Sequence, residues 1–286
     1  MKRDRLLTGQ FNRPCQAIWV VLLIAVHALT SSLALAADDR AAVSTINHAF
    51  ATELGTGVYD IAGRSVFIVS ITPAYELREA TDTRVGVRMV FPMSGGSFNF
   101  RPDDAIDGKL PNRIDSYSIM PGFEFDFLLR KDWVLTPWLR AGASFAEGNS
   151  DGLLWGLGAR VGRELEFDEV SLTQRHEVGL VAVNYRGLPN DRFLRQRNAV
   201  DLRQPTFPIG FGRRLLVSAY SILDVVPDPP AAPAGVKPSV VQLEAGVTLN
   251  GDPRPQIGSW RWPRLGFGYR FAGEFSGWRI VIGAPF

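Results

Sequence analysis

Histidine and serine are the first residues to test for hydrolytic chemistry, and the chain has only 3 histidines. His27 lies in an apolar leader, which leaves His48 and His176. Ser171 is five residues before His176, an odd spacing that puts the two side chains on opposite faces of a strand. A nucleophile and its base must lie within hydrogen-bonding reach. We therefore predict no catalytic residues and no enzymatic activity, with His176 at a packing or rim position.

The chain also has few residues that could bind a metal ion or act as a thiol nucleophile. Asp103 and Asp104, in the stretch RPDDAIDG, could begin a paired-acid site or a calcium loop, but neither a histidine partner nor a ligand spacing accompanies them. Cys15 is the only cysteine, and it precedes the apolar run of the leader. The sequence therefore predicts a polar loop at residues 103–104, no metal site, no cofactor and no disulfide.

Most of the chain after residue 64 alternates between apolar and polar side chains. In Ser116–Leu129 and Trp133–Ala146, one face is aromatic or aliphatic and the other carries Gly, Ser, Thr and charged residues. Such alternation predicts half-buried strands, and many of them at short spacing predict an antiparallel barrel or sandwich. Because the apolar face is bulky and aromatic-rich, the pattern favours a transmembrane β-barrel whose apolar face meets lipid.

We predict an all-β fold, an antiparallel transmembrane β-barrel of about twelve strands with about ten as the alternative, because barrels of bacterial outer membranes use even numbers. Glu169–Tyr185 does not reveal which of its faces is apolar. Residues 95–112 and the region around 198–206 could each hide a further strand. The clearly visible strands fall roughly at 65–77, 83–92, 116–129, 133–146, 152–164, 169–185, 211–226, 238–250, 261–272 and 276–286.

Charged residues recur on the polar face of these strands and are expected to point into the lumen. An isolated buried charge is costly, so the favoured interpretation is a set of paired charges that neutralise one another. The alternative is a narrow pore whose arginine-biased wall favours anions. The predicted lumen-facing residues are Arg84, Arg88, Glu124, Asp126, Arg140, Arg160, Glu244, Arg264, Arg270 and Arg279.

The start of the chain has the order of a secretory signal peptide. Basic residues precede an apolar run over 17–35, and small residues follow at an A-x-A cleavage site. We predict a signal peptide over 1–36, a leader with a short amphipathic helix over 37–62, and the barrel over 63–286. Since the basic excess lies in the signal, no nucleic-acid partner is expected. The export machinery is the partner that the signal implies.

The last stretch, GWRIVIGAPF, alternates strictly and ends on an aromatic residue. It resembles the terminal strand signal of Gram-negative outer-membrane proteins, with Trp278, Ile280, Ile282, Ala284 and Phe286 at the matching positions. The usual aromatic third from the end is Ala284 here. The resemblance implies recognition by the barrel-assembly machinery, and we expect this strand to close the barrel against 65–77 with Trp278 and Phe286 at the two membrane interfaces.

A short helix followed by about twelve strands also resembles the translocator barrel of autotransporters, here without a passenger. The resemblance implies a protein of the Gram-negative outer membrane, with outer-membrane lipid as a partner. We therefore expect a non-enzymatic barrel of autotransporter-like type, acting as a structural or surface component or as a narrow, porin-like solute channel. The alternatives are an outer-membrane enzyme acting on lipid or peptide, and a secreted β-sandwich binding module.

Overall fold

The computed structural model consists almost entirely of β-strand. The predicted signal peptide and the loop with Asp103 and Asp104 lie outside the described residues. Among the residues that are described, no helix is long and apolar enough to cross a membrane. The structure describes residues 48–61, 64–99, 113–130, 132–146, 151–167, 170–186, 190–210, 213–227, 240–252, 256–257, 260–261, 263–273 and 275–286.

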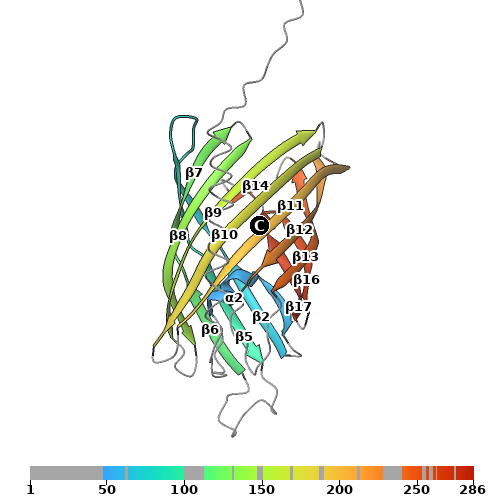
Figure 1. Cartoon of the computed structure of the whole chain (residues 1–286). Coiled ribbons are helices and arrows are strands. Elements are labelled where there is room, and N and C mark those ends of the chain that lie inside the picture. Colours follow the sequence, from blue (N-terminus) through green and yellow to red (C-terminus); the bar gives the residue numbers. More distant parts are fainter. Residues whose placement is uncertain are drawn as a thin grey trace, which may run out of the picture. The chain divides into compact units, whose positions relative to one another are not determined.

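One short helix, α2 (His48–Leu54), precedes the strands (Figure 1). Two very short strands, β14 (Gln256–Ile257) and β15 (Trp260–Arg261), form a separate hairpin. The wall of the barrel is made of β1 (Gly57–Ile61), β2 (Arg64–Ile71), β3 (Ala74–Arg78), β4 (Gly86–Val90), β5 (Met93–Asn99), β6 (Arg113–Ile119), β7 (Gly122–Arg130), β8 (Trp133–Ala146), β9 (Gly152–Phe167), β10 (Val170–Tyr185), β11 (Asp191–Gly210), β12 (Arg213–Val225), β13 (Val241–Asp252), β16 (Leu265–Ala272) and β17 (Phe275–Ile282).

The sheet closes on itself. Its last strand, β17, pairs with β1 in antiparallel register, with Gly57 opposite Arg279. On the other side of the ring β8 pairs with β9 along most of its length. The result is the predicted closed antiparallel barrel of 12 strands, not the smaller alternative.

Two strands of the ring were not recognised as such in the sequence. β11 covers the region around 198–206 in which a hidden strand was suspected. Of the suspected region 95–112, residues 95–99 belong to β5, which continues the strand predicted at 83–92, and residues 100–112 lie outside the described residues. β1 lies inside the predicted leader and takes the place beside β17 that was expected for residues 65–77. That expectation was wrong because a strand of 5 residues is too short to show an alternating pattern.

Three neighbouring strands of the wall are each divided in two by a proline. Proline has no N–H to donate to the ladder, so the strand is interrupted where it occurs. Each proline carbonyl still accepts a hydrogen bond from the next strand, which keeps the ring connected. The bonds run from Phe91 N to Pro73 O at 2.9 Å, from Met120 N to Pro92 O at 2.8 Å and from Ala141 N to Pro121 O at 2.9 Å.

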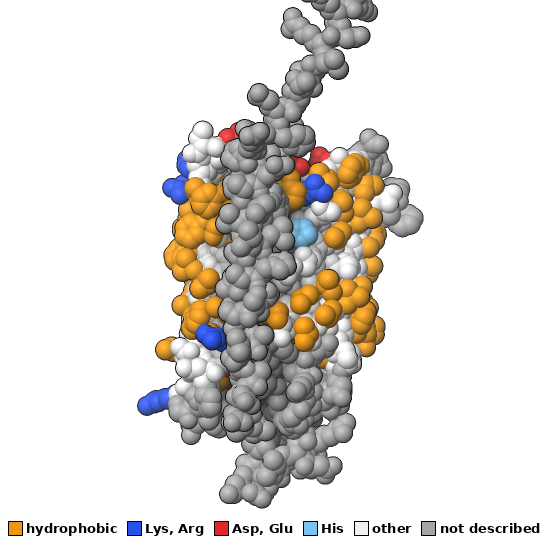
Figure 2. Space-filling view, in the orientation of Figure 1, with side chains coloured by type: hydrophobic (Ala, Val, Ile, Leu, Met, Phe, Trp, Pro, Cys, Tyr) orange, Lys and Arg blue, Asp and Glu red, His pale blue; other side chains and the backbone are white. Residues whose placement is uncertain are grey.

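The outer face of the barrel is apolar, as predicted. Figure 2 shows hydrophobic side chains spread over the sides of the barrel between its two ends. Leu139, Phe267 and Trp278 are each about half exposed. On this face the rings of Phe267 and Trp278 stack with their centroids 4.8 Å apart. An apolar outer surface flanked by polar rims is the surface that a bilayer accommodates.

The inner face uses glycine to seat large aromatic rings flat against the wall. Trp138 on β8 is 3% exposed. Its ring lies across the facing glycines of the next two strands, and a Cβ added at Gly158 or Gly179 would come within 2.6 or 2.7 Å of it. Tyr220 lies over Gly246 and Gly268 in the same way. Glycine on the strand is needed here because the ring occupies the space of a side chain.

We predict that Gly158→Ala destabilises the folded barrel. Its new Cβ would lie 2.4 Å from the carbonyl oxygen of Val178 as well as against the Trp138 ring. Overpacking of this kind costs about 1 to 3 kcal/mol. The measurement is urea unfolding of the refolded barrel in detergent or lipid.

Gly162→Ala on the same strand is the matched control. Its nearest contact would be the flexible side chain of Arg175, at 3.3 Å. We expect its unfolding midpoint to stay close to that of the unmodified barrel. Equal midpoints for the two variants would contradict the packing of Trp138 against Gly158.

Candidate functional site

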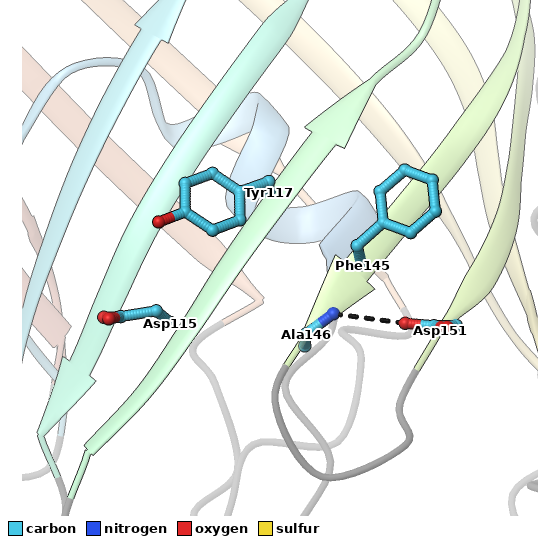
Figure 3. Close-up of a pocket in the computed structure, with 5 residues that line it drawn as sticks. All are labelled: Asp115, Tyr117, Phe145, Ala146 and Asp151. Carbon is cyan, nitrogen blue, oxygen red and sulfur yellow. Dashed lines mark hydrogen bonds between the residues drawn. The ribbon is translucent and has the colours of Figure 1, made fainter.

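The lumen holds the short helix α2. Its Phe50 ring meets the ring of Phe193 on β11 edge-on, with centroids 5.9 Å apart. Phe50 also packs against the buried cluster that includes Leu54 and Ile68. The helix as a whole lies beside β10 on one side of the ring and beside β2, β5 and β6 on the other. Figures 1 and 3 show the helix inside the ring of strands. The predicted short helix is therefore present, and it lies across the interior.

A left-handed residue and a tyrosine hydroxyl hold the end of this helix. Gly55 has φ 82° and follows the last helical residue, as expected of a helix-ending glycine. The Tyr59 hydroxyl donates a hydrogen bond to the carbonyl oxygen of Leu54 at 2.7 Å. Leu54 itself is 2% exposed. The turn into β1 is thereby fixed within the barrel wall.

Glu124 on β7 is the centre of a buried group of charges. It is 4% exposed. It accepts from Arg140 Nη2 at 3.1 Å and from Arg160 Nη2 at 3.0 Å. Arg88 lies 3.6 Å from it and binds the neighbouring Asp126 at 2.7 Å. A single carboxylate thus faces three guanidinium groups, and removing it would leave them without their shared counter-charge.

The same chain of ion pairs continues along the wall to the helix. Arg160 on β9 lies 3.7 Å from Glu177 on β10. Glu177 in turn accepts from Arg195 on β11 at 2.7 Å. The other side of the Arg195 guanidinium binds Glu53 of α2. Helix and wall are therefore joined by a buried pair of opposite charges.

A second group of charges lies on β11 to β17. Arg197 binds both carboxylate oxygens of Asp224 at 2.7 and 2.8 Å. Arg270 lies between Asp224, at 3.3 Å, and Glu244, at 2.9 Å. Arg279 donates to Glu244 at 2.8 Å. Bidentate contact between guanidinium and carboxylate is among the stronger side-chain hydrogen-bond arrangements.

Together these residues form what we call the lumenal charge belt. It passes from strand to strand around most of the ring in two runs of ion pairs. The runs meet at Arg195 and Arg197, two residues apart on β11, which each bind a carboxylate of a different run. The belt consists of Arg88, Glu124, Asp126, Arg140, Arg160, Glu177, Arg195, Arg197, Asp224, Glu244, Arg270 and Arg279.

A third buried group surrounds Asp201 and stands apart from the belt. Arg264 donates to its two carboxylate oxygens at 2.9 and 3.2 Å. The same guanidinium also bonds to the hydroxyls of Ser218 and Thr248. Each polar group in this cluster has a partner, which is what makes burial of a charge tolerable.

Most of the predicted lumen-facing residues meet in these groups. Arg84 does not: it lies exposed in the turn before β4, bridged through its backbone to Thr81. The prediction for Arg84 was wrong because its strand begins at Gly86. Sequence reasoning missed several members, which lie on the helix or on strands whose alternation was unclear: Glu53, Glu177, Arg195, Arg197, Asp201 and Asp224.

His176 and Ser171 do not form a catalytic pair. His176 on β10 is exposed, and its Nδ1 lies 2.8 Å from Asn198 Oδ1 on β11. Ser171 is five residues away on the same strand, on its other face, as predicted. Among the described residues, no group of three or more His, Cys, Asp or Glu side chains could hold a metal ion.

The residues of the predicted assembly signal do not all face the same way. Trp278, Ile280 and Ile282 lie outward on β17 and are each more than half exposed. The strand ends at Ile282, and Gly283 has φ 97°. Beyond it Phe286 packs against the inner cluster of Ala199, Tyr220, Ile222 and Val281, and Ala284 is exposed.

We expected Phe286 at a membrane interface, and this expectation was wrong, because its ring packs on the inner side of the wall. Arg175 on β10 binds its main-chain oxygen, and the guanidinium lies over its ring at 5.6 Å. The turn at Gly283 reverses the side on which the following residues lie. Recognition of these residues by the assembly machinery stays a prediction.

An open pocket of about 280 Å³ lies at the rim where β6 begins, β8 ends and β9 begins (Figure 3). Tyr117 on β6 and Phe145 on β8 are directly opposite in register, and both side chains are exposed. Asp115 and Asp151 lie on the rim side of the two rings, and Asp151 accepts a hydrogen bond from the Ala146 amide at 3.3 Å. Aromatic rings beside polar groups are typical of the interface level of membrane barrels.

No model of a protein family matches the chain. No curated protein matches it either. Among solved structures it is similar to the translocator domain of the autotransporter NalP from Neisseria meningitidis, with 13% identity over 80% of this chain and 85% of that chain and a TM-score of 0.55.

Two further solved structures are less similar. The β domain of the Bordetella autotransporter BrkA has 12% identity over 79% of this chain and 96% of that chain, with a TM-score of 0.49. LpxR from Salmonella typhimurium has 12% identity over 75% and 88%, with a TM-score of 0.43. The predicted resemblance to an autotransporter translocator barrel is confirmed at the level of the fold.

We predict that Glu124→Gln destabilises the barrel strongly. The substitution leaves three arginines around an uncharged side chain. Breaking a buried charge pair by removing one partner costs on the order of 3 kcal/mol or more. Urea unfolding of the refolded barrel measures the loss.

Glu164→Gln is the control, because that side chain is 51% exposed and lies 3.8 Å from Arg203. Exposed ion pairs contribute between about 0 and 1 kcal/mol. An unfolding midpoint for Glu124→Gln that equals the control would show that the belt contributes nothing to stability.

Proposed function

We propose that the chain is an outer-membrane β-barrel of the translocator type from a Gram-negative bacterium. Its lumen is closed by α2, and it acts as a non-enzymatic structural or surface component of the membrane. The single observation that carries the proposal is the helix held across the interior by the Glu53–Arg195 pair. A solute would have to displace both the helix and buried ion pairs in order to pass.

The outer-membrane location is supported by three independent features. The outer face is largely apolar, the backbone ladder closes into a ring through β1 and β17, and the first 36 residues have the order of a signal peptide. Only closed barrels and helices satisfy their backbone hydrogen bonds within lipid. Outer-membrane lipid, the export machinery and the barrel-assembly machinery are the partners that this location requires.

The non-enzymatic role is supported by the chemistry of the interior. The belt consists of guanidinium and carboxylate groups that are bound to one another, and a carboxylate held by two or three arginines is a poor base. The candidate pair of His176 and Ser171 lies on opposite faces of one strand. These features favour a scaffold over a hydrolytic site.

A narrow anion channel is the second candidate, and one observation favours it. Buried arginine nitrogens with no hydrogen-bond partner lie at several points of the interior, among them Nε of Arg140, Arg195 and Arg279. Such donors are normally satisfied by water, and a hydrated cationic wall favours anions. In this candidate, ions would pass beside the helix.

Single-channel recording in planar bilayers distinguishes the two. We predict that the full barrel gives no sustained current, because α2 lies across the lumen and is held there by Arg195 and Phe193. Deletion of residues 48–54 should produce steady conductance steps, since the pair at Arg195 and the packing against Phe193 are then lost.

Glu53→Gln should give intermittent openings, whereas Glu164→Gln at the exposed edge should leave the barrel closed. Sustained anion-selective current from the unmodified barrel, equal to that of the deletion, would refute the closed lumen. It would instead support the narrow channel.

A further inference from the structure

One part of the lipid-facing surface is polar. On β10 and β11 the outward positions carry Gln174, His176, Gln196 and Asn198, which we call the outer polar patch. Apart from Arg163 on β9, which is opposite Gln174, most outward positions on the other described strands are aliphatic, aromatic or small. Examples are Phe67 on β2, Leu139 on β8 and Phe267 on β16.

The patch is contiguous and lies away from both ends of its strands. His176 is directly opposite Asn198, and the two side chains are hydrogen-bonded at 2.8 Å. Gln174 accepts from Arg163 Nε on β9 at 2.7 Å. Gln196 is exposed and faces Val178 across the β10–β11 pair. β10 continues for six residues on one side of His176 and for nine on the other.

Polar side chains on the outer face of a membrane barrel cost free energy when they face lipid tails. Each amide carries two N–H donors and an acceptor oxygen, and each neutral imidazole carries one donor and one acceptor. The His176–Asn198 bond uses one donor and one acceptor and leaves the remaining capacity of both groups pointing outward. Hydrocarbon offers no partner for it, so a protein surface that can donate and accept there gains free energy.

We propose that the outer polar patch is the interface between two copies of this chain in the membrane. Its groups are amides and an imidazole, which both donate and accept, so a two-fold related copy of the same surface can satisfy them. A charged partner would require opposite charges, whereas the one cation beside the patch, Arg163, already binds Gln174 and lies over the Trp133 ring at 5.0 Å. Val178 and Leu223 flank the polar groups and provide apolar packing around them.

This inference rests on the membrane location in the proposed function, so its test uses barrels that have already folded into membranes. The only natural cysteine is Cys15, and in a Cys15→Ser background single cysteines can be introduced freely. Gln196→Cys places a thiol in the patch. Phe67→Cys is the matched control, because that residue is also outward and half exposed but lies on β2, on a distant part of the ring.

Crosslinking in intact membranes with a short bismaleimide is the measurement. We expect Gln196→Cys to give a product of twice the barrel mass, several-fold more abundant than the chance product of Phe67→Cys. Adding His176→Leu and Asn198→Leu to Gln196→Cys should reduce the product to the control level. The heat-dependent gel mobility that reports a folded barrel should be the same with and without the two leucine substitutions, because leucine suits a lipid-facing position.

Three outcomes would overturn the proposal. Gln196→Cys could crosslink no better than Phe67→Cys, or the product could persist after both leucine substitutions. A crosslinked product of a different mass would show that the patch binds another membrane protein. Loss of the membrane-folded form from all variants, including Phe67→Cys, would instead count against the proposed membrane barrel itself.

Discussion

The closed backbone ladder is the constraint on which the rest of the structure depends. A lipid environment supplies no hydrogen bonds, so every strand must be paired on both sides. The pairing of β1 with β17 closes the ring at the point where the two ends of the strand series come together, and among the described strands of the wall β3 alone is paired on one side only. Closure then divides the side chains into two sets, because alternate residues of each strand must face either the bilayer or the lumen. The prolines at 73, 92 and 121 are compatible with a closed ladder, since their carbonyl oxygens still accept hydrogen bonds from the next strand.

The lumen poses the opposite problem, which is how to enclose charge in a narrow space. In the lumenal charge belt most carboxylates lie between arginines of neighbouring strands, as Glu124 and Glu244 show. The same chemistry attaches α2, whose Glu53 supplies one more acid to the belt at Arg195. Barrel stability and closure of the lumen are thus two consequences of one network. The outer polar patch is the part of the molecule in which the division between polar inside and apolar outside is broken.

The sequence predicted this fold wherever one face of a strand meets lipid and the other the lumen. β7 and β8 were therefore recognised, and so was the apolar outer face. β11 was not clearly recognised because Gln196 and Asn198 lie outward among apolar neighbours and disturb its alternation. Two thirds of the belt was predicted. Glu177, Arg195, Arg197 and Asp224 were missed, because their strands either do not show which face is apolar or were not clearly recognised as strands. The inward turn of Phe286 depends on Gly283 and on Arg175, which is 111 positions away in the chain, so local pattern could not reveal it.

The central claim is that alternate residues face lipid and a closed, charged lumen. Quenching of tryptophan fluorescence by lipids with brominated acyl chains tests it most directly. Two variants would each retain one tryptophan, Trp278 on the outer face or Trp138 on the inner face, with the others replaced by phenylalanine. The structure predicts strong quenching of Trp278, which is 52% exposed on the outer face, and little quenching of Trp138, which is 3% exposed and lies against Gly158 and Gly179. Equal quenching of the two, or stronger quenching of Trp138, would contradict it.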